Sequence, residues 1–152
     1  MFKFSLKLIG RGWTKATITN GSEEISVTGT YLSDAIRDFI MVITTIVEGA
    51  ENVTCSWQEE PGQYRWLISR RDGSIELSIL WYDKAFSHQR NEDGQQIFSC
   101  TADLRRFGKS VQRELDRMVY EYGVEGYKRT WNYDFPLREL DRLRTALDQL
   151  SY

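Results

Sequence analysis

The run of residues from Leu32 to Val47 constrains the fold of this chain more than any other stretch. Its apolar side chains recur every three or four residues, which is the spacing of one face of an α-helix. These apolar positions are Leu32, Ile36, Phe39, Ile40, Ile43, Ile46 and Val47. Ser33 precedes them as a capping residue, and Gly49 supplies the left-handed residue that commonly follows a last turn. We therefore expect a helix buried on more than one side, with a buried strand as the alternative because several residues are β-branched.

Strands are predicted on both sides of this helix, because apolar and polar residues alternate there with the two-residue period of a sheet. The turn dipeptides Asn20-Gly21, Pro61-Gly62 and Asp72-Gly73 separate several of these segments. The alternating segments are residues 2–9, 13–19, 25–31, 53–58, 64–69, 75–82 and 97–100.

Two more helices are predicted near the C-terminus, because apolar residues within 104–122 and 137–150 recur at helical spacing. The predicted order of elements is therefore βββαββββαα. Short hairpin connections favour antiparallel pairing. We expect a single α+β domain over residues 1–152, with one antiparallel sheet of about six to seven strands and helices packed on one face.

Composition restricts the class of function. The chain has 152 residues, of which 41% are hydrophobic and 28% charged, and its formal net charge is -2. Such a balance is typical of an ordered globular protein and argues against a dominant nucleic-acid-binding surface. The N-terminus lacks the pattern of a signal peptide, and no apolar run is long enough to cross a bilayer. We expect a cytoplasmic protein that binds neither nucleic acid nor membrane.

Familiar motifs of catalysis and metal binding are missing from the sequence. His88 is the only histidine, and no acidic residue adjoins it. A single histidine excludes most metal sites that rely on imidazole. The adjacent carboxylates Glu59 and Glu60 are the best general-acid candidates, but neighbouring strand residues usually point to opposite sides of a sheet. We therefore predict no catalytic residue, no metal and no cofactor.

Aromatic and acidic residues instead indicate contact with another protein. Five tryptophans and eight tyrosines exceed what a core of this size requires, and exposed aromatics are typical anchors of interfaces. Carboxylates can meet the cations of a basic partner and raise the rate of association. The predicted partner-binding residues are Glu59, Glu60, Tyr64, Trp66, Asp83, Asp93 and Trp131.

Two alternatives to a protein-binding domain stay open. A pocket on the sheet lined by Trp57, Trp66 and Trp81, with Glu59 or Arg70 as its polar group, would indicate a small-molecule-binding or enzymatic domain. A homodimer that pairs an edge strand or packs the last helix would indicate a structural protein with no other partner.

Several short segments resemble those of known proteins. They are Trp57–Trp66, Gly126-Tyr127, and Trp131 ahead of Phe135-Pro136. Together with the layout of the chain, they resemble uncharacterised small bacterial proteins, some of which are similar to immunity proteins of polymorphic or contact-dependent toxin systems. The resemblance implies a cytoplasmic binding protein that neutralises a toxin domain, and it brings no catalytic motif to this sequence.

Overall fold

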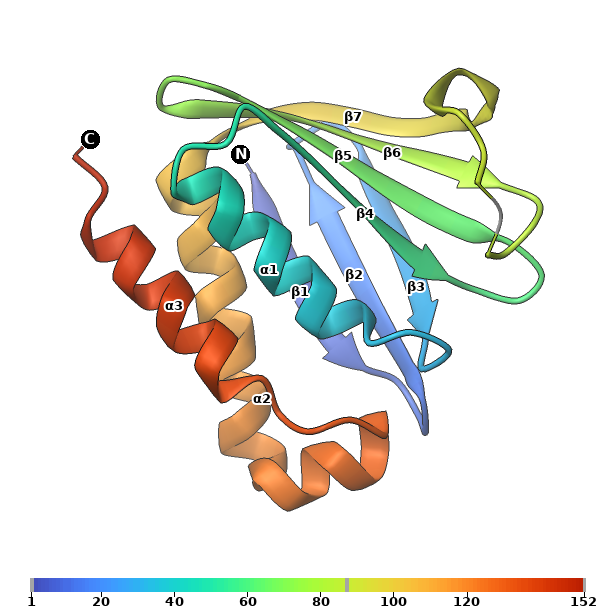
Figure 1. The fold of residues 1–152 in the computed structure, drawn as a ribbon, viewed down its shortest axis with the longest axis vertical. Helices are drawn as coiled ribbons and strands as arrows, with labels where there is room; N and C mark the ends of the chain where they lie inside the picture. The colour runs from blue at the N-terminus through green and yellow to red at the C-terminus, as the bar shows by residue number, and fades with distance from the viewer. Residues whose placement is uncertain (1, 87, 152) are drawn as a thin grey trace.

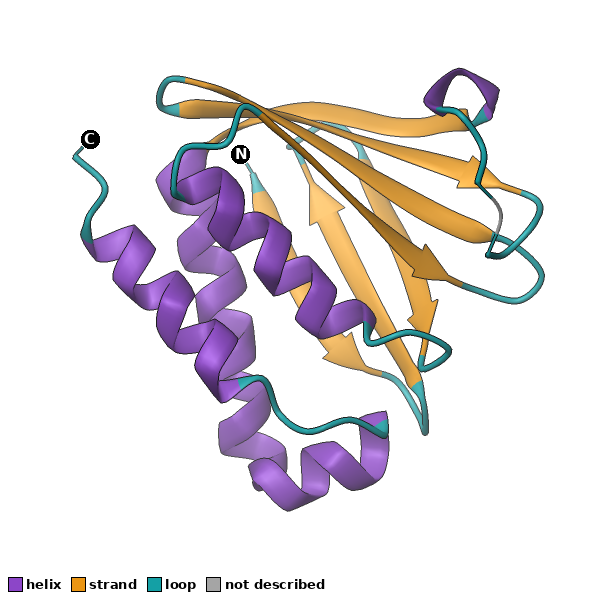
Figure 2. Ribbon diagram, viewed as in Figure 1, coloured by secondary structure: helices purple, strands orange, loops and turns teal. Residues whose placement is uncertain are grey.

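Within residues 2–86 and 88–151, which this computed structural model describes, the chain forms two antiparallel sheets and three α-helices (Figures 1 and 2). Sheet A has the order β1-β2-β3, and sheet B has the order β4-β5-β6-β7. A short 3-10 helix, η1, precedes β7, and the predicted order βββαββββαα is confirmed. The bounds are β1 Lys3–Leu8, β2 Trp13–Thr19, β3 Glu24–Thr30, α1 Ala35–Val47, β4 Asn52–Gln58, β5 Gln63–Arg71, β6 Ser74–Tyr82, η1 Asn91–Asp93, β7 Gln95–Asp103, α2 Leu104–Trp131 and α3 Leu137–Asp148.

The prediction of one sheet of six to seven strands is wrong, because β3 and β4 do not pair. They are separated by α1, so no hairpin fixes a register between them. Their ends meet (Figure 1), where the Thr30 hydroxyl donates to the Gln58 carbonyl at 2.9 Å. Gly29 lies so close to the Trp57 ring that a Cβ added there would be 3.0 Å from it. Side-chain contacts such as these, and not a backbone ladder, join the two sheets where β3 meets β4.

Phe39 of α1 is the residue at which both sheets and a second helix meet. Its ring centroid lies 5.7 Å from that of Phe4 in sheet A and 4.7 Å from that of Trp66 in sheet B. The ring of Phe107 in α2 is 6.3 Å away. Phe39 is completely buried, and aromatic pairs at these distances contribute beyond the area that they bury. The predicted helix, buried on more than one side, is confirmed.

Both ends of α1 are held by other elements. Asp34, and not Ser33, caps its first turn, and the same carboxylate accepts a bond from Trp131 Nε1 at 2.9 Å. Burial raises the pKa of Asp34 above its usual value. At the other end, Arg70 Nη1 donates to the carbonyls of the last two helical residues at 3.0 and 2.9 Å. The position of α1 is therefore fixed by polar contacts as well as by its apolar face.

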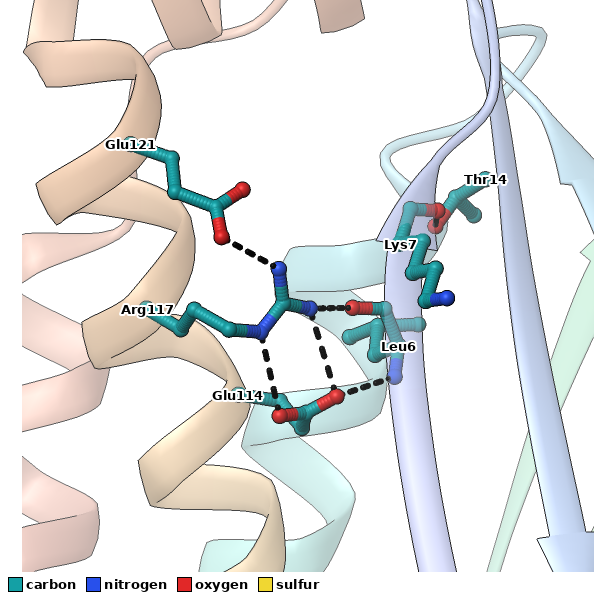
Figure 3. Close-up of polar contacts among 6 residues, drawn as sticks. All are labelled: Leu6, Lys7, Thr14, Glu114, Arg117 and Glu121. Carbon is teal, nitrogen blue, oxygen red and sulfur yellow. Dashed lines mark hydrogen bonds and ion pairs between the residues drawn. The ribbon is translucent and has the colours of Figure 1, made fainter.

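Side chains of α2 close the outer edge of β1 (Figure 3). Glu114 Oε1 accepts the Leu6 N–H at 2.8 Å, and Arg117 Nη2 donates to the Leu6 carbonyl at 2.7 Å. Arg117 is itself oriented by Glu114 and by Glu121, whose carboxylate is 3.1 Å from Nη1. Unpaired strand edges can recruit further strands. The cation and the carboxylate together occupy one such edge.

Gly123 bends α2 without ending it. Its φ of +69° and ψ of 167° are not helical, and a helical segment continues beyond it to Trp131. The Thr130 carbonyl there accepts the N–H of Gly12 in the turn between β1 and β2, at 2.8 Å. The bend therefore returns the end of α2 to sheet A.

Replacing Phe39 with Ala is expected to lower the free energy of unfolding by about 3–5 kcal/mol, because the packing of both sheets and α2 meets at this ring. Urea denaturation followed by tryptophan fluorescence measures the loss. Phe86→Ala removes a ring of the same size that is 62% exposed, and it is expected to cost less than about 0.5 kcal/mol. Equal losses in the two variants would contradict the central position of Phe39.

Candidate functional site

Two loops at one end of sheet B are tied together. The Ala85 N–H donates to the carbonyl of Pro61 in the β4–β5 turn at 2.9 Å. Gln63 Nε2 donates to the Lys84 carbonyl at 3.0 Å, and Gln58 Oε1 accepts the Phe86 N–H at 2.7 Å. Both glutamines are buried. Leaving a buried amide without a hydrogen-bond partner costs free energy. These bonds therefore hold the β4–β5 turn and the β6–β7 loop in one arrangement.

Arg65 fastens the rest of the β6–β7 loop to the outer face of sheet B. Its Nη1 donates to the Tyr82 hydroxyl at 3.0 Å, the Gln89 carbonyl at 2.7 Å and Asn91 Oδ1 at 2.9 Å. The guanidinium carbon also lies 4.5 Å above the centre of the Tyr82 ring. The Tyr82 hydroxyl donates in turn to the Arg90 carbonyl at 2.8 Å. Burial raises the pKa of Tyr82, and Arg65 opposes that rise.

Three carboxylates lie on these tied loops, and we refer to Glu59, Glu60 and Asp83 as the acidic end. The Thr28 hydroxyl donates to Glu59, which links this end to β3. Trp81 Nε1 donates to Asp83 at 2.9 Å. Within the described part of the chain, none of the three carboxylates forms an ion pair. Their negative charges are therefore not neutralised by salt bridges there.

Two other predicted partner-binding residues lie close to the acidic end. Asp93 lines a shallow cleft of about 260 Å³ together with Asp83, but it is paired with Arg90 at 3.6 Å. Tyr64 is half-buried, and its ring centroid is 4.8 Å from that of Trp81. Residues from both loops and from neighbouring strands therefore gather at this end of sheet B.

Trp66 and Trp131 are not available to a partner, which corrects their assignment to the binding surface. Both side chains are fully buried, with exposed fractions of 0%. Trp66 packs on Phe39, and Trp131 donates to Asp34. Trp57, which the alternative of a pocket on the sheet would place in the pocket lining, is completely buried beside Trp66 at a centroid distance of 5.2 Å. This side of sheet B is filled by the core.

Phe86 is a surface residue that the sequence did not single out. It lies in the β6–β7 loop with 62% of its side chain exposed, beside the acidic end. The only signal in the sequence is a single aromatic residue inside a polar segment, and such a residue has no periodic neighbour to assign it to a core.

The side chains and helices of residues 2–86 and 88–151 also bear on metal binding and on membrane insertion. No group of three or more His, Cys, Asp and Glu side chains is arranged there to hold a metal ion. None of the helices in that part of the chain is both long and apolar enough to cross a membrane. Cys55 and Cys100 are free thiols, and burial raises the pKa of each.

Neither the family models nor the curated protein sequences include a match to this chain. Among solved structures, a chain of the CdiA-CT/CdiI toxin and immunity complex from Enterobacter cloacae is similar to it, with 11% sequence identity and a TM-score of 0.49. The similarity covers 76% of this chain and 99% of that chain.

Replacing Arg65 with Met is expected to release the β6–β7 loop, because it removes a charged donor with three acceptors. Amide hydrogen exchange of residues 89–94 is expected to quicken, and the free energy of unfolding to fall by about 1–3 kcal/mol. Arg71→Met on the same strand is the control, since Arg71 forms an exposed pair with Glu76 worth at most about 1 kcal/mol. Unchanged exchange in the Arg65 variant would contradict its role.

Proposed function

We propose that this chain is a non-catalytic protein-binding domain that neutralises a cationic toxin domain, as an immunity protein does. The acidic end of sheet B is the observation that carries the proposal. It presents three carboxylates without ion pairs in the described chain, and the exposed ring of Phe86 lies beside them. An apolar anchor next to unneutralised charges is a common composition of an interface.

The rigidity of this surface supports a binding role. Gln58, Gln63 and Arg65 hold the two loops through bonds to three backbone groups and to the side chains of Tyr82 and Asn91. Ordering a loop costs free energy at the moment of binding. A surface whose loops are already fixed avoids much of that cost, so a larger part of the contact energy would appear as affinity.

Electrostatics supports a cationic partner. Carboxylates that form no ion pair attract a basic domain before contact and raise its rate of association. Many toxins that act on nucleic acids carry basic surfaces because they must bind phosphates. A binding domain with this charge would cover such a surface, and we place its action in the cytoplasm, where those targets lie.

The proposal is tested with a toxin domain encoded by a gene next to that of this chain. Co-expression is expected to restore growth of cells that produce the toxin, and the purified proteins are expected to form a one-to-one complex. The association rate constant, measured by stopped-flow fluorescence, is expected to fall by about ten-fold or more as salt is raised. Growth arrest that persists at equal expression, with no complex in solution, would contradict the proposal.

Neutralising the acidic end by E59Q, E60Q and D83N together is expected to lower the association rate constant by about ten-fold and to leave the dissociation rate constant little changed. The control E23Q/E125Q/D148N removes the same charge from three exposed carboxylates elsewhere. Stopped-flow measurements at low salt compare the two variants. Equal association rates would show that the net charge, and not the acidic end, attracts the partner.

A further inference from the structure

The outward edge of β4 is open over its middle. The Glu59 N–H donates to the Gly62 carbonyl, and the Arg70 N–H donates to the Glu51 carbonyl, both at 2.8 Å. Antiparallel ladders alternate between bonded and non-bonded pairs. Because Glu51 bonds to β5 and Glu59 to the residue before it, the backbone groups of odd-numbered residues in β4 also bond to β5. The backbone N–H and carbonyl groups of even-numbered residues in β4 point outward, away from β5.

Two residues in the middle of β4 therefore present free backbone groups. The outward carbonyl of Gln58 accepts the Thr30 hydroxyl, which agrees with this assignment. The N–H and carbonyl groups of Thr54 and Ser56 also point outward, and no partner for them occurs among the described residues. Alternating backbone donors and acceptors of this kind are what an added strand binds when it extends a sheet.

Two other edges, those of β1 and β7, are less suited to pairing. The edge of β1 is occupied by Glu114 and Arg117 (Figure 3). In β7, the register with β6 shifts between Ile79 and Leu80, so this edge strand carries a bulge. Bulges twist an edge and interrupt the regular spacing of its backbone groups. The edge of β4 has a continuous register with β5.

A groove of about 480 Å³ runs beside the open edge. Residues of α1, residues of β4 and the ring of Phe86 surround it. They are Ser33, Asp38, Met41, Val42, Thr54, Cys55, Ser56, Gln58 and Phe86. Met41 and Val42 of α1 and Cys55 of β4 provide an apolar wall, and Asp38 is the one charged residue of this set. The groove thus combines free backbone groups with an apolar surface and a single negative charge.

Charge distinguishes the occupants that this groove can accept. Asp38 lies close enough to Cys55 for its charge to add to the effect of burial in raising the pKa of the thiol. Glu51 adjoins one end of β4 and Glu59 the other. In a second copy paired antiparallel about Cys55, Glu51 of one chain would lie opposite Glu59 of the other. Like charges placed opposite each other are destabilising, so the occupant that fits is a basic segment.

We propose that an extended, basic segment of the protein partner adds to sheet B along β4, bonded to the backbone groups of Thr54 and Ser56, with a Lys or Arg side chain at Asp38. This inference rests on the proposed function, because it names how that partner is held. Backbone bonds supply affinity in such strand addition, and alternate side chains supply specificity. Side chains two positions before and after that cation lie on the same face of the added strand, and the apolar wall of the groove receives them.

A capped eight-residue peptide with Lys and Val alternating along one face, and Thr at every other position, is the first probe. Binding to the whole chain is expected to shift the amide resonances of Thr54 and Ser56 and to slow their hydrogen exchange. The same peptide with N-methyl groups on its four central amides cannot donate to the edge, and it is expected to bind at least about ten-fold more weakly. Equal affinities, or resonance shifts confined to other elements, would overturn the inference.

Ser56→Pro is the second probe, with Ser56→Thr as its matched control. Proline removes one outward N–H and is tolerated at edge positions whose N–H faces solvent. The melting temperatures of the proline and threonine variants are compared to check that both fold. The proline variant is expected to lose about ten-fold in peptide affinity, and the threonine variant to keep it. If the proline variant does not fold, the N-methylated peptide still decides the question with the unaltered chain.

Further outcomes separate this inference from the function on which it rests. A toxin domain that binds equally well to the Ser56→Pro and Ser56→Thr proteins would overturn strand addition and leave the proposed function standing. If the molar mass of the unaltered chain and of the Ser56→Thr protein doubles with concentration, and that of the Ser56→Pro protein does not, a second copy occupies the β4 edge. That result would overturn the addition of a partner segment. A toxin domain that neither binds nor is neutralised would overturn the proposed function, whatever the peptide does.

Discussion

The packing around Phe39 determines how the two sheets are placed. No ladder joins β3 to β4, so the angle between sheet A and sheet B is not set by backbone hydrogen bonds. One ring of α1 contacts Phe4 of one sheet and Trp66 of the other, and Phe107 of α2 closes the cluster. The helix is in turn anchored at both ends by Asp34 and Arg70. Side-chain packing thus determines the relative position of sheet A and sheet B, just as backbone hydrogen bonds determine that of paired strands.

Local sequence patterns predicted the elements but not how they assemble. Helical periodicity and turn dipeptides act over a few residues, so α1 and the order of strands were predictable. Whether β3 pairs with β4 depends on contacts between segments on either side of α1, and no local pattern encodes such contacts. Trp66 was assigned to the binding surface because the chain has many aromatic residues. It lies on the same face of its strand as Ile68, however, and both side chains are buried. Trp131 follows the bend at Gly123, beyond the reach of the periodicity that precedes it.

The acidic end shows a similar limit. Glu59 and Asp83 follow predicted strands, and antiparallel pairing of consecutive strands puts the β4–β5 turn and the β6–β7 loop at the same end of the sheet. Strand order does not predict how closely the two loops approach each other. Their proximity comes from Gln58 and Gln63, whose buried amides bond to the β6–β7 loop. The sequence alone does not show whether a glutamine in a strand is buried and bonded to a loop or exposed to solvent. Phe86 became recognisable as a surface residue only once this loop had been placed.

The junction between the sheets has a consequence for how the chain can vary. Where β3 meets β4, the contacts to be kept are those of side chains: the Thr30 and Thr28 hydroxyls, and the approach of Gly29 to Trp57. A change in the length of the connection on either side of α1 would not shift a register, because there is none between these strands. Each sheet can therefore accumulate substitutions as a separate unit, so long as the ring of Phe39 still fits between them.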